Sequence, residues 1–253
     1  MPSPFPDLPI ITPPGDERLS TPEKYGALFY LGLAGLAALV GMIVWFAYGV
    51  AMNWSMWTNI YILHDAKRPE AERIVAADSL ASDSRMNQRQ YWDIVMRDGL
   101  PPIARYRLAE ALNAEATSAD PDAYAAAVVE STAWPEWLRV LIARPMLYAV
   151  NRGVDFADEP IRLLTLRADP FLSLIGIYVQ SLQRGGDPRA QRMLEQVATQ
   201  DGPARATALL LVKSLHEKEP ERTRLLDEAS RGLREAMPAA AELWRGWSDK
   251  IGK

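Results

Sequence analysis

One stretch near the start of the chain, Tyr25–Met52, constrains the fold most, because its 28 residues carry no charged side chain. A helix needs about 20 predominantly apolar residues to cross the hydrocarbon core of a bilayer. Since lipid offers no water to satisfy backbone polar groups, an uncharged segment of this length is expected to cross as one helix. Aromatic residues, whose rings prefer the headgroup level, gather at both ends: Tyr25, Tyr30, Trp45, Tyr48, Trp54, Trp57 and Tyr61.

Two other structures are open to this segment: a cleaved signal peptide, or a buried helix in a water-soluble core. A signal peptide has a basic start and an apolar region of about 7–15 residues. The residues before this stretch instead hold four acidic side chains against Arg18 and Lys24, and the apolar run is longer. We therefore expect an uncleaved, single-pass transmembrane helix at residues 24–52.

The orientation of this helix follows from the basic residues that flank it. Arg18 and Lys24 precede it, and Lys67 and Arg68 follow it. Lys24 lies directly against the helix start, whereas the two bases after the helix stand well back from its end. This pattern favours a cytoplasmic N-terminus and an extracytoplasmic C-terminal domain, in a bacterial inner membrane.

Small residues share one face of the helix, because spacings of three and four positions bring residues to the same side. They are Ala34, Ala37, Ala38 and Gly41. Such a face lets two membrane helices approach closely, although small residues are also common in membrane helices in general. These four residues are the candidates for helix association, including association into a homo-oligomer.

The rest of the chain divides into three segments. Residues 1–23 hold seven prolines, and because proline lacks an amide donor this tail is expected to be extended or disordered. Residues 53–68 form a juxtamembrane segment, whose uncharged part Asn53–Leu63 is expected to continue the helix through the interface. Residues 69–253 then form one domain, or two small ones, outside the bilayer.

A regular series of prolines organises residues 69–253. Proline suits the first turn of a helix, because its missing amide donor would be unpaired there. Spacings of 33, 33, 35, 33 and 35 residues separate Pro69, Pro102, Pro135, Pro170, Pro203 and Pro238. Each precedes an apolar helical run, and three aspartates are suitable caps: Asp98, Asp169 and Asp201.

A second series of prolines interleaves with the first at Pro121, Pro160, Pro188 and Pro220, and Arg85–Arg97 fills the same place in the first unit. The chain thus alternates short helices, two for each period. Such hairpins cannot bury their apolar faces alone, so neighbours must stack. The sequence predicts an all-α fold, in which a single transmembrane helix is followed by an α-solenoid of short helical hairpins.

Two places interrupt the regular pattern. The unit lengthens at Asn151–Asp158, where we expect a loop or a bend. Pro145 lies inside the apolar run RVLIARPMLYAV and is expected to kink that helix.

Two units resemble known repeat families. The unit Pro170–Pro203 resembles a tetratricopeptide repeat in its small residues and its turn: Gly176, Gly186, Asp187 and Ala190. The unit Asp98–Leu112 is more similar to a HEAT-type repeat, with an aspartate, a proline and Arg105 opening a helix. The period favours the tetratricopeptide over the HEAT family. Either resemblance implies a scaffold that grips partner proteins or peptides, usually along a concave surface.

Composition argues against several classes of function. The net charge of −4 offers no basic field for nucleic acid, and the absence of cysteine removes thiolate catalysis and cysteine-ligated metals. Arginine outnumbers lysine by 22 to 6, a ratio more typical of genome composition than of a binding role.

No motif for chemistry stands out in the chain. Neither His64 nor His216 has a partner at ligand spacing, and no nucleotide-binding or hydrolase motif occurs. We expect no enzyme, no cofactor, no metal site and no small-molecule substrate.

Tryptophan occurs in three pairs with a spacing of three, which places each pair on one helix face. Trp54 and Trp57 belong to the membrane interface, and Trp134 with Trp137 are expected to pack between helices. The third pair, Trp244 and Trp247, lies in the terminal repeat. These two rings either form an exposed patch that binds a partner or fold back onto the core.

These patterns predict a membrane-anchored helical-repeat scaffold that mediates protein–protein interactions at the membrane surface. The plan resembles that of bacterial anchored tetratricopeptide proteins that assist translocation or envelope assembly. The alternative is an obligate structural subunit of a larger membrane complex, with the transmembrane helix packing through its small residues.

Overall fold

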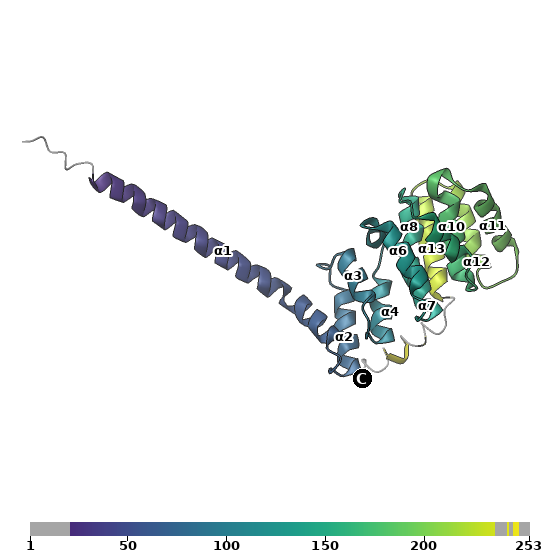
Figure 1. Cartoon of the computed structure of the whole chain (residues 1–253), viewed down its shortest axis with the longest axis horizontal. Helices are drawn as coiled ribbons and strands as arrows, with labels where there is room; N and C mark the ends of the chain where they lie inside the picture. Colours follow the sequence, from purple (N-terminus) through teal and green to yellow (C-terminus); the bar gives the residue numbers. More distant parts are fainter. Residues whose placement is uncertain (1–20, 236–241, 243–244, 248–253) are drawn as a thin grey trace, which may run out of the picture. The chain divides into compact units, whose positions relative to one another are not determined.

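The computed structural model describes residues 21–235, 242 and 245–247, and within these residues the fold is all-helical (Figure 1). Thirteen α-helices and one short 3₁₀-helix are present there, and no strand occurs among them. The predicted all-α class is therefore confirmed for the described part of the chain. The proline-rich tail lies almost wholly outside it, as do Pro238 and Trp244.

The first helix, α1, runs from Thr21 to His64, and the chain divides into two compact units at Ser55 and Met56. The helix continues through Asn53–Leu63, as predicted. In the first unit its large apolar side chains face outward on all sides, and Trp45 reaches 78% exposure. By length and composition, α1 is long and apolar enough to span a membrane.

The second unit is a stack of short helices, which follow the last turns of α1. Their bounds are α2 (Glu70–Ala81), α3 (Gln88–Val95), α4 (Pro102–Glu110), α5 (Glu115–Ser118), α6 (Pro121–Glu130), α7 (Glu136–Ala143), α8 (Pro145–Asn151), α9 (Asp158–Thr165), α10 (Pro170–Leu182), η2 (Gln183–Gly185), α11 (Pro188–Thr199), α12 (Arg205–His216) and α13 (Glu221–Glu235).

Prolines mark the helix starts, as the spacing predicts. Pro69 and Pro135 are the N-cap residues of α2 and α7, and Pro102 is the first residue of α4, directly after the N-cap Pro101. Pro170 opens α10, where the Asp169 carboxylate accepts hydrogen bonds from the amides of the next turn at 2.8 and 3.0 Å. Because the first amides of a helix have no intrahelical partner, the Asp169 side chain fixes where α10 begins, whereas the three N-cap prolines make no side-chain cap hydrogen bond.

Helices that follow one another in the two proline series pack together in the second unit. Helix α4 packs against α2 and α7, and α7 packs against α10. Farther along the chain, α10 contacts α9 and α11, and α12 lies between α11 and α13 (Figure 1). Helix α13 also contacts α7, although the two helices are far apart in the chain.

The core of the second unit contains tyrosines whose hydroxyl groups all find partners. Tyr124 is fully buried, stacks on Trp92 with ring centroids 4.0 Å apart, and donates a hydrogen bond to the Ile142 carbonyl at 2.5 Å. The Tyr178 hydroxyl accepts from the Asn151 amide and shares a hydrogen bond with Ser214, each at 2.9 Å. These bonds remove the cost of burying a polar group among apolar neighbours.

The expected interruptions are present. Residues 152–157 form a loop with Gly153 at a φ of +81°. At Pro145 the helix is interrupted: α7 ends at Ala143 and α8 begins at Pro145, and Arg144 between them keeps helical dihedral angles (φ −49°, ψ −43°). Proline has no amide to donate to the preceding turn, which ends the first helix there.

Gly176 lets α10 approach α9 closely. A Cβ atom at this position would lie 2.7 Å from the Thr165 amide nitrogen and 2.9 Å from the Leu164 Cβ. Both neighbouring atoms belong to the α9 terminus, so neither can move without shifting that helix. The small residue that resembles the tetratricopeptide pattern is therefore required by packing.

We predict that Gly176→Ala lowers the free energy of unfolding by about 1–3 kcal/mol, because overpacking forces the two helices apart. The matched control is Gly202→Ala, since a Cβ at Gly202 meets nothing within 4 Å. Urea unfolding of the chain in detergent, followed by tryptophan fluorescence, measures both. Equal effects of the two variants would contradict the close approach of α9 and α10.

Arginines bind the free carbonyl ends of helices throughout the second unit. Arg73, Arg105 and Arg139 each lie four residues after an N-cap proline. Their guanidinium groups donate to carbonyls at the end of the preceding helix: Arg73 to Leu63 at 2.9 Å, Arg105 to Arg97 at 2.6 Å, and Arg139 to Val129 at 3.3 Å and Val128 at 3.4 Å. The last four carbonyls of a helix have no intrahelical partner, so these bonds satisfy them.

The middle arginine also contacts one of the tryptophans singled out by their spacing. The Arg105 guanidinium lies 4.2 Å from the ring centroid of Trp134, a cation–π contact. Trp137 meets Tyr106 edge to face at 5.8 Å. Trp137 is in the first turn of α7, Trp134 directly precedes the N-cap of that helix, and both partners belong to α4, so the predicted packing between helices is confirmed.

We predict that Arg139→Met lowers the free energy of unfolding by about 0.5–1.5 kcal/mol, because the carbonyls of Val128 and Val129 lose one donor and keep only Ser131 and Arg167. Arg162 is an exposed arginine paired with Glu159 at 2.8 Å, and Arg162→Met is the control. Surface pairs of this kind contribute little to stability. A loss for Arg162→Met as large as that for Arg139→Met would contradict the assigned role.

Candidate functional site

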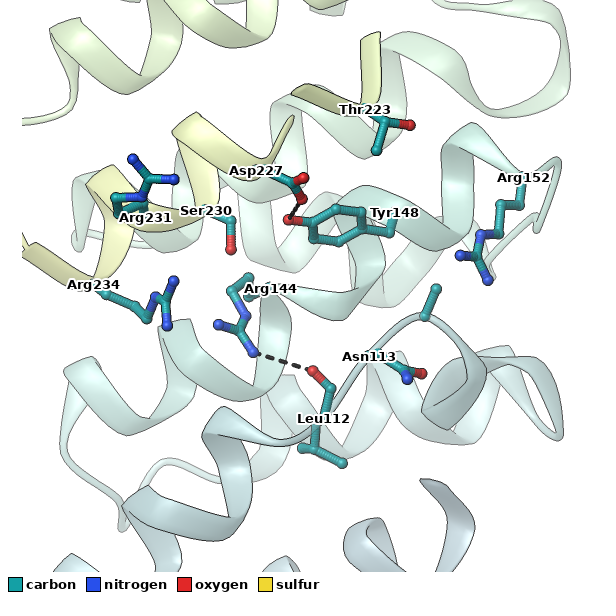
Figure 2. Close-up of a pocket in the computed structure, with 11 residues that line it drawn as sticks. Leu112, Asn113, Arg144, Tyr148, Arg152, Thr223, Asp227, Ser230, Arg231 and Arg234 are labelled. Atoms are coloured by element: carbon teal, nitrogen blue, oxygen red, sulfur yellow. Dashed lines mark hydrogen bonds between the residues drawn. The ribbon is translucent and has the colours of Figure 1, made fainter. Parts of the chain in front are cut away.

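A cavity of about 530 Å³ lies in the second unit between the turn after α4, helix α8 and helix α13 (Figure 2). Most of the residues that line it are polar or charged. The lining residues are Leu112, Asn113, Ala114, Arg144, Tyr148, Arg152, Thr223, Asp227, Ser230, Arg231 and Arg234. We call this cavity the arginine pocket.

The division of the helix at Pro145 brings Arg144 to this pocket. Arg144 occupies the junction of α7 and α8, and its Nη2 donates to the carbonyls of Glu110 at 2.8 Å and Leu112 at 3.1 Å. The residue is only 7% exposed. A guanidinium held by two backbone carbonyls is fixed in place before any ligand arrives.

Tyr148 joins α8 to α13 across the pocket wall. Its hydroxyl donates to the Asp227 carboxylate at 2.9 Å, and the Leu226 carbonyl lies 3.3 Å away. Burial, together with the hydrogen bond and charge of Asp227, raises the pKa of the Tyr148 hydroxyl, and the hydrogen bond with Ser230 and the charge of Arg144 oppose this effect. The hydroxyl therefore stays protonated at neutral pH and remains a hydrogen-bond donor.

Positive charge is concentrated at the pocket, although the chain as a whole carries −4. Four arginines line it against the single carboxylate of Asp227. Burial lowers the pKa of Arg144 from its usual value, and the positive charge of Arg234 adds to this effect. Arginine nevertheless stays protonated in proteins, so these like charges face one another in a partly dry site.

The other arginines of the pocket are incompletely paired. Arg234 lies 3.9 Å from a Glu110 oxygen, and its buried Nε has no hydrogen-bond partner in the described part of the chain. Arg152 and Arg231 are exposed, and neither guanidinium has a carboxylate partner among the residues that the structure describes. Fixed positive charge with free donors is the chemistry of anion binding.

A second cavity, of about 300 Å³, lies where α10 meets the loop before α12. It also contains arginine, but Arg205 is paired with Asp201 at 2.8 Å, and Arg167 donates to the Val129 carbonyl at 2.7 Å. The Nε of Arg167 has no partner among the described residues, but this cavity holds two arginines where the larger one holds four. We take the arginine pocket as the candidate site.

The sequence-predicted residues lie elsewhere. Ala34, Ala37, Ala38 and Gly41 are exposed on one face of α1 in the first unit. Trp247 is 6% exposed and belongs to the hydrophobic core, which agrees with the folded-back arrangement rather than with an exposed patch. Trp244 lies outside the described residues.

The arginine pocket itself was not predicted. A signal exists in α13, where Arg231 and Arg234 have the spacing of one helix face. Arginine is frequent along the whole chain, so this spacing does not distinguish a binding site. The pocket residues on α8 are also distant from α13 in the sequence. Among the described residues, no group of three or more histidine, aspartate or glutamate side chains could hold a metal ion.

Comparisons with known proteins add no relative. No protein-family model, no curated protein and no solved structure matches the chain.

We predict that Trp247→Ala lowers the free energy of unfolding by about 3–5 kcal/mol, because a buried indole leaves a large cavity when it is removed. Thermal and urea unfolding of the full chain in detergent measure the loss. An unchanged melting temperature together with the loss of a bound partner would instead identify Trp247 as part of a binding patch.

Proposed function

We propose that this chain is a single-pass membrane protein whose second unit is a helical-repeat scaffold for protein partners at the membrane surface. The observation that carries the proposal is the apolar surface of α1. Its large side chains are exposed around the whole helix, including Phe29, Leu36 and Phe46. A helix that is apolar all round is stable in water only when something covers it, and lipid covers it on every side.

A repeat architecture for the second unit is supported by the order of packing. The helices of the first proline series, α2, α4, α7 and α10, contact one another in succession. Each begins at a proline, and arginines of the first three bind the carbonyl end of the preceding helix. In an α-solenoid each repeat contacts its neighbours. The contact between α13 and α7 would add a contact between the last repeat and an earlier one.

A binding role rather than a catalytic one is supported by the arginine pocket. Its groups supply charge and hydrogen-bond donors, and the Tyr148 hydroxyl is held protonated by its surroundings. The repeat families that two units of the sequence resemble grip peptides or proteins. The position of the second unit outside the cytoplasm of a bacterial cell remains a proposal that rests on Lys24 beside the helix start.

The alternative, an obligate structural subunit of a larger membrane complex, is favoured by the small face of α1. Ala34, Ala37, Ala38 and Gly41 lie exposed there, and a Cβ added at Gly41 meets nothing within 4 Å. Such a face admits close contact with another membrane helix. Both functions place α1 in the bilayer. In the scaffold the second unit binds the partners, whereas in the structural subunit the small face of α1 binds another membrane helix.

Crosslinking in native membranes, followed by purification in mild detergent, separates the two. We predict that the chain stays in the membrane after alkaline extraction and captures partners through residues 56–253. The variant Ala38→Leu with Gly41→Leu blocks the small face and is expected to leave this capture unchanged. Release of the chain by alkali would contradict the membrane helix, and loss of a fixed stoichiometric complex in the double variant would favour the structural subunit.

The side of the membrane is tested by protease added to sealed membranes of known orientation. Cleavage of residues 56–253 from the extracytoplasmic side, with protection from the cytoplasmic side, is expected. The opposite pattern would reverse the orientation and restrict the partners to cytoplasmic proteins.

A further inference from the structure

We propose that the arginine pocket binds the carboxylates of an acidic segment of a partner protein. The inference rests on the proposed function, because it names the chemistry by which the scaffold recognises its partner. Four guanidinium groups line the pocket against one carboxylate, whereas two arginines line the second cavity.

The first argument is the pair of guanidinium groups at one end of the pocket. Figure 2 shows Arg144 and Arg234 at the same end, reached from the α7–α8 junction and from α13. Arg144 uses only Nη2 for its two backbone bonds. Arg234 has a long ion pair at 3.9 Å and an unpartnered Nε. An anion between them would accept charge-assisted hydrogen bonds from both and relieve their repulsion.

The second argument is that this end of the pocket is already organised. The Glu110 carboxylate, which pairs with Arg234, is itself held by the Tyr106 hydroxyl at 2.8 Å and by Arg107 at 3.1 Å. Arg144 is held by the backbone. A ligand that meets fixed donors loses less entropy on binding than one that must order them.

The third argument is the arrangement along the pocket. Arg152 lies at the other end, beyond the ring of Tyr148, and Asn113 lies between the two ends (Figure 2). The Asn113 Oδ1 accepts from the Glu115 amide at 2.8 Å, so its side-chain nitrogen is the group left to donate. Cationic ends joined by a polar middle match an extended segment with more than one acidic side chain.

The fourth argument is the balance of charge in the pocket. The Asp227 carboxylate lines the pocket, is kept there by the Tyr148 hydroxyl at 2.9 Å, and offsets one of the four guanidinium charges. The remaining positive charge attracts an anion, and a planar guanidinium matches a carboxylate in two parallel hydrogen bonds.

The fifth argument favours a peptide over a small free acid. The pocket of about 530 Å³ is large enough for either. Arg152 and Arg231 are exposed, however, so a ligand that contacts them stays partly in water. A segment that crosses the pocket and continues on both sides contacts these exposed arginines as well as Arg144 and Arg234. A small acid bound at one end would contact Arg144 and Arg234 alone.

The test measures binding of a fluorescent hexaglutamate peptide to the full chain in uncharged detergent, by fluorescence anisotropy. We expect saturable binding that weakens with added salt, and no binding of the matching hexaglutamine peptide. Arg234→Gln and Arg152→Gln should each weaken binding by about tenfold. Arg144 is kept unchanged, because its bonds to Glu110 and Leu112 support the turn.

The matched control is Arg192→Gln, which removes the same charge from an exposed position on α11 away from the pocket. It should leave binding unchanged, and thermal unfolding confirms that each variant is folded. Equal binding by wild type and Arg234→Gln, or equal weakening by Arg192→Gln, would overturn the proposal.

Competition identifies the ligand class. Displacement of the peptide by inorganic phosphate or glutarate at lower concentration than by unlabelled hexaglutamate would overturn the peptide assignment. So would binding to anionic phospholipid vesicles that depends on Arg152 and Arg234 while hexaglutamate fails to bind. Partner capture in membranes by the wild-type chain without any hexaglutamate binding would reject this inference and leave the proposed function standing.

Discussion

The binding of guanidinium groups to helix ends is the interaction on which the second unit depends. Short helices leave a large share of their carbonyl groups without intrahelical partners, and a stack of them buries many such groups. Arg73, Arg105 and Arg139 supply donors at those ends, and each comes from the helix that opens the next pair. The bonds therefore satisfy buried polar groups and join successive helices at the same time.

The same chemistry connects the fold to the candidate site. Arg144 holds the carbonyls of Glu110 and Leu112 from the break that Pro145 creates, and this leaves the rest of its guanidinium at the pocket. Helix α13 closes the pocket when it returns to α7 and α8, through Tyr148 and Asp227. Arg144 thus has two roles. It binds carbonyls at and just after the end of α4, and together with Arg234 it forms part of the binding surface.

Local features of the fold were predictable from the sequence, because proline and aspartate fix a helix start within a few residues. The uncharged stretch predicted α1, and the proline spacing predicted the starts of α2, α4, α7 and α10. The pocket was not predictable, since Tyr148 and Asp227 meet across 79 residues. The arginine excess was attributed to genome composition, because nothing in a sequence shows which carbonyl an arginine will reach.

Hydrogen exchange of the full chain with Arg105→Met in detergent tests most directly whether these arginines join successive helices. The account predicts faster exchange together in α3, which ends near the Arg97 carbonyl, and in α4, which carries Arg105, with α11 and α12 unchanged. Exchange that stays as slow as in the wild type in α3, or that rises equally throughout the second unit, would contradict it.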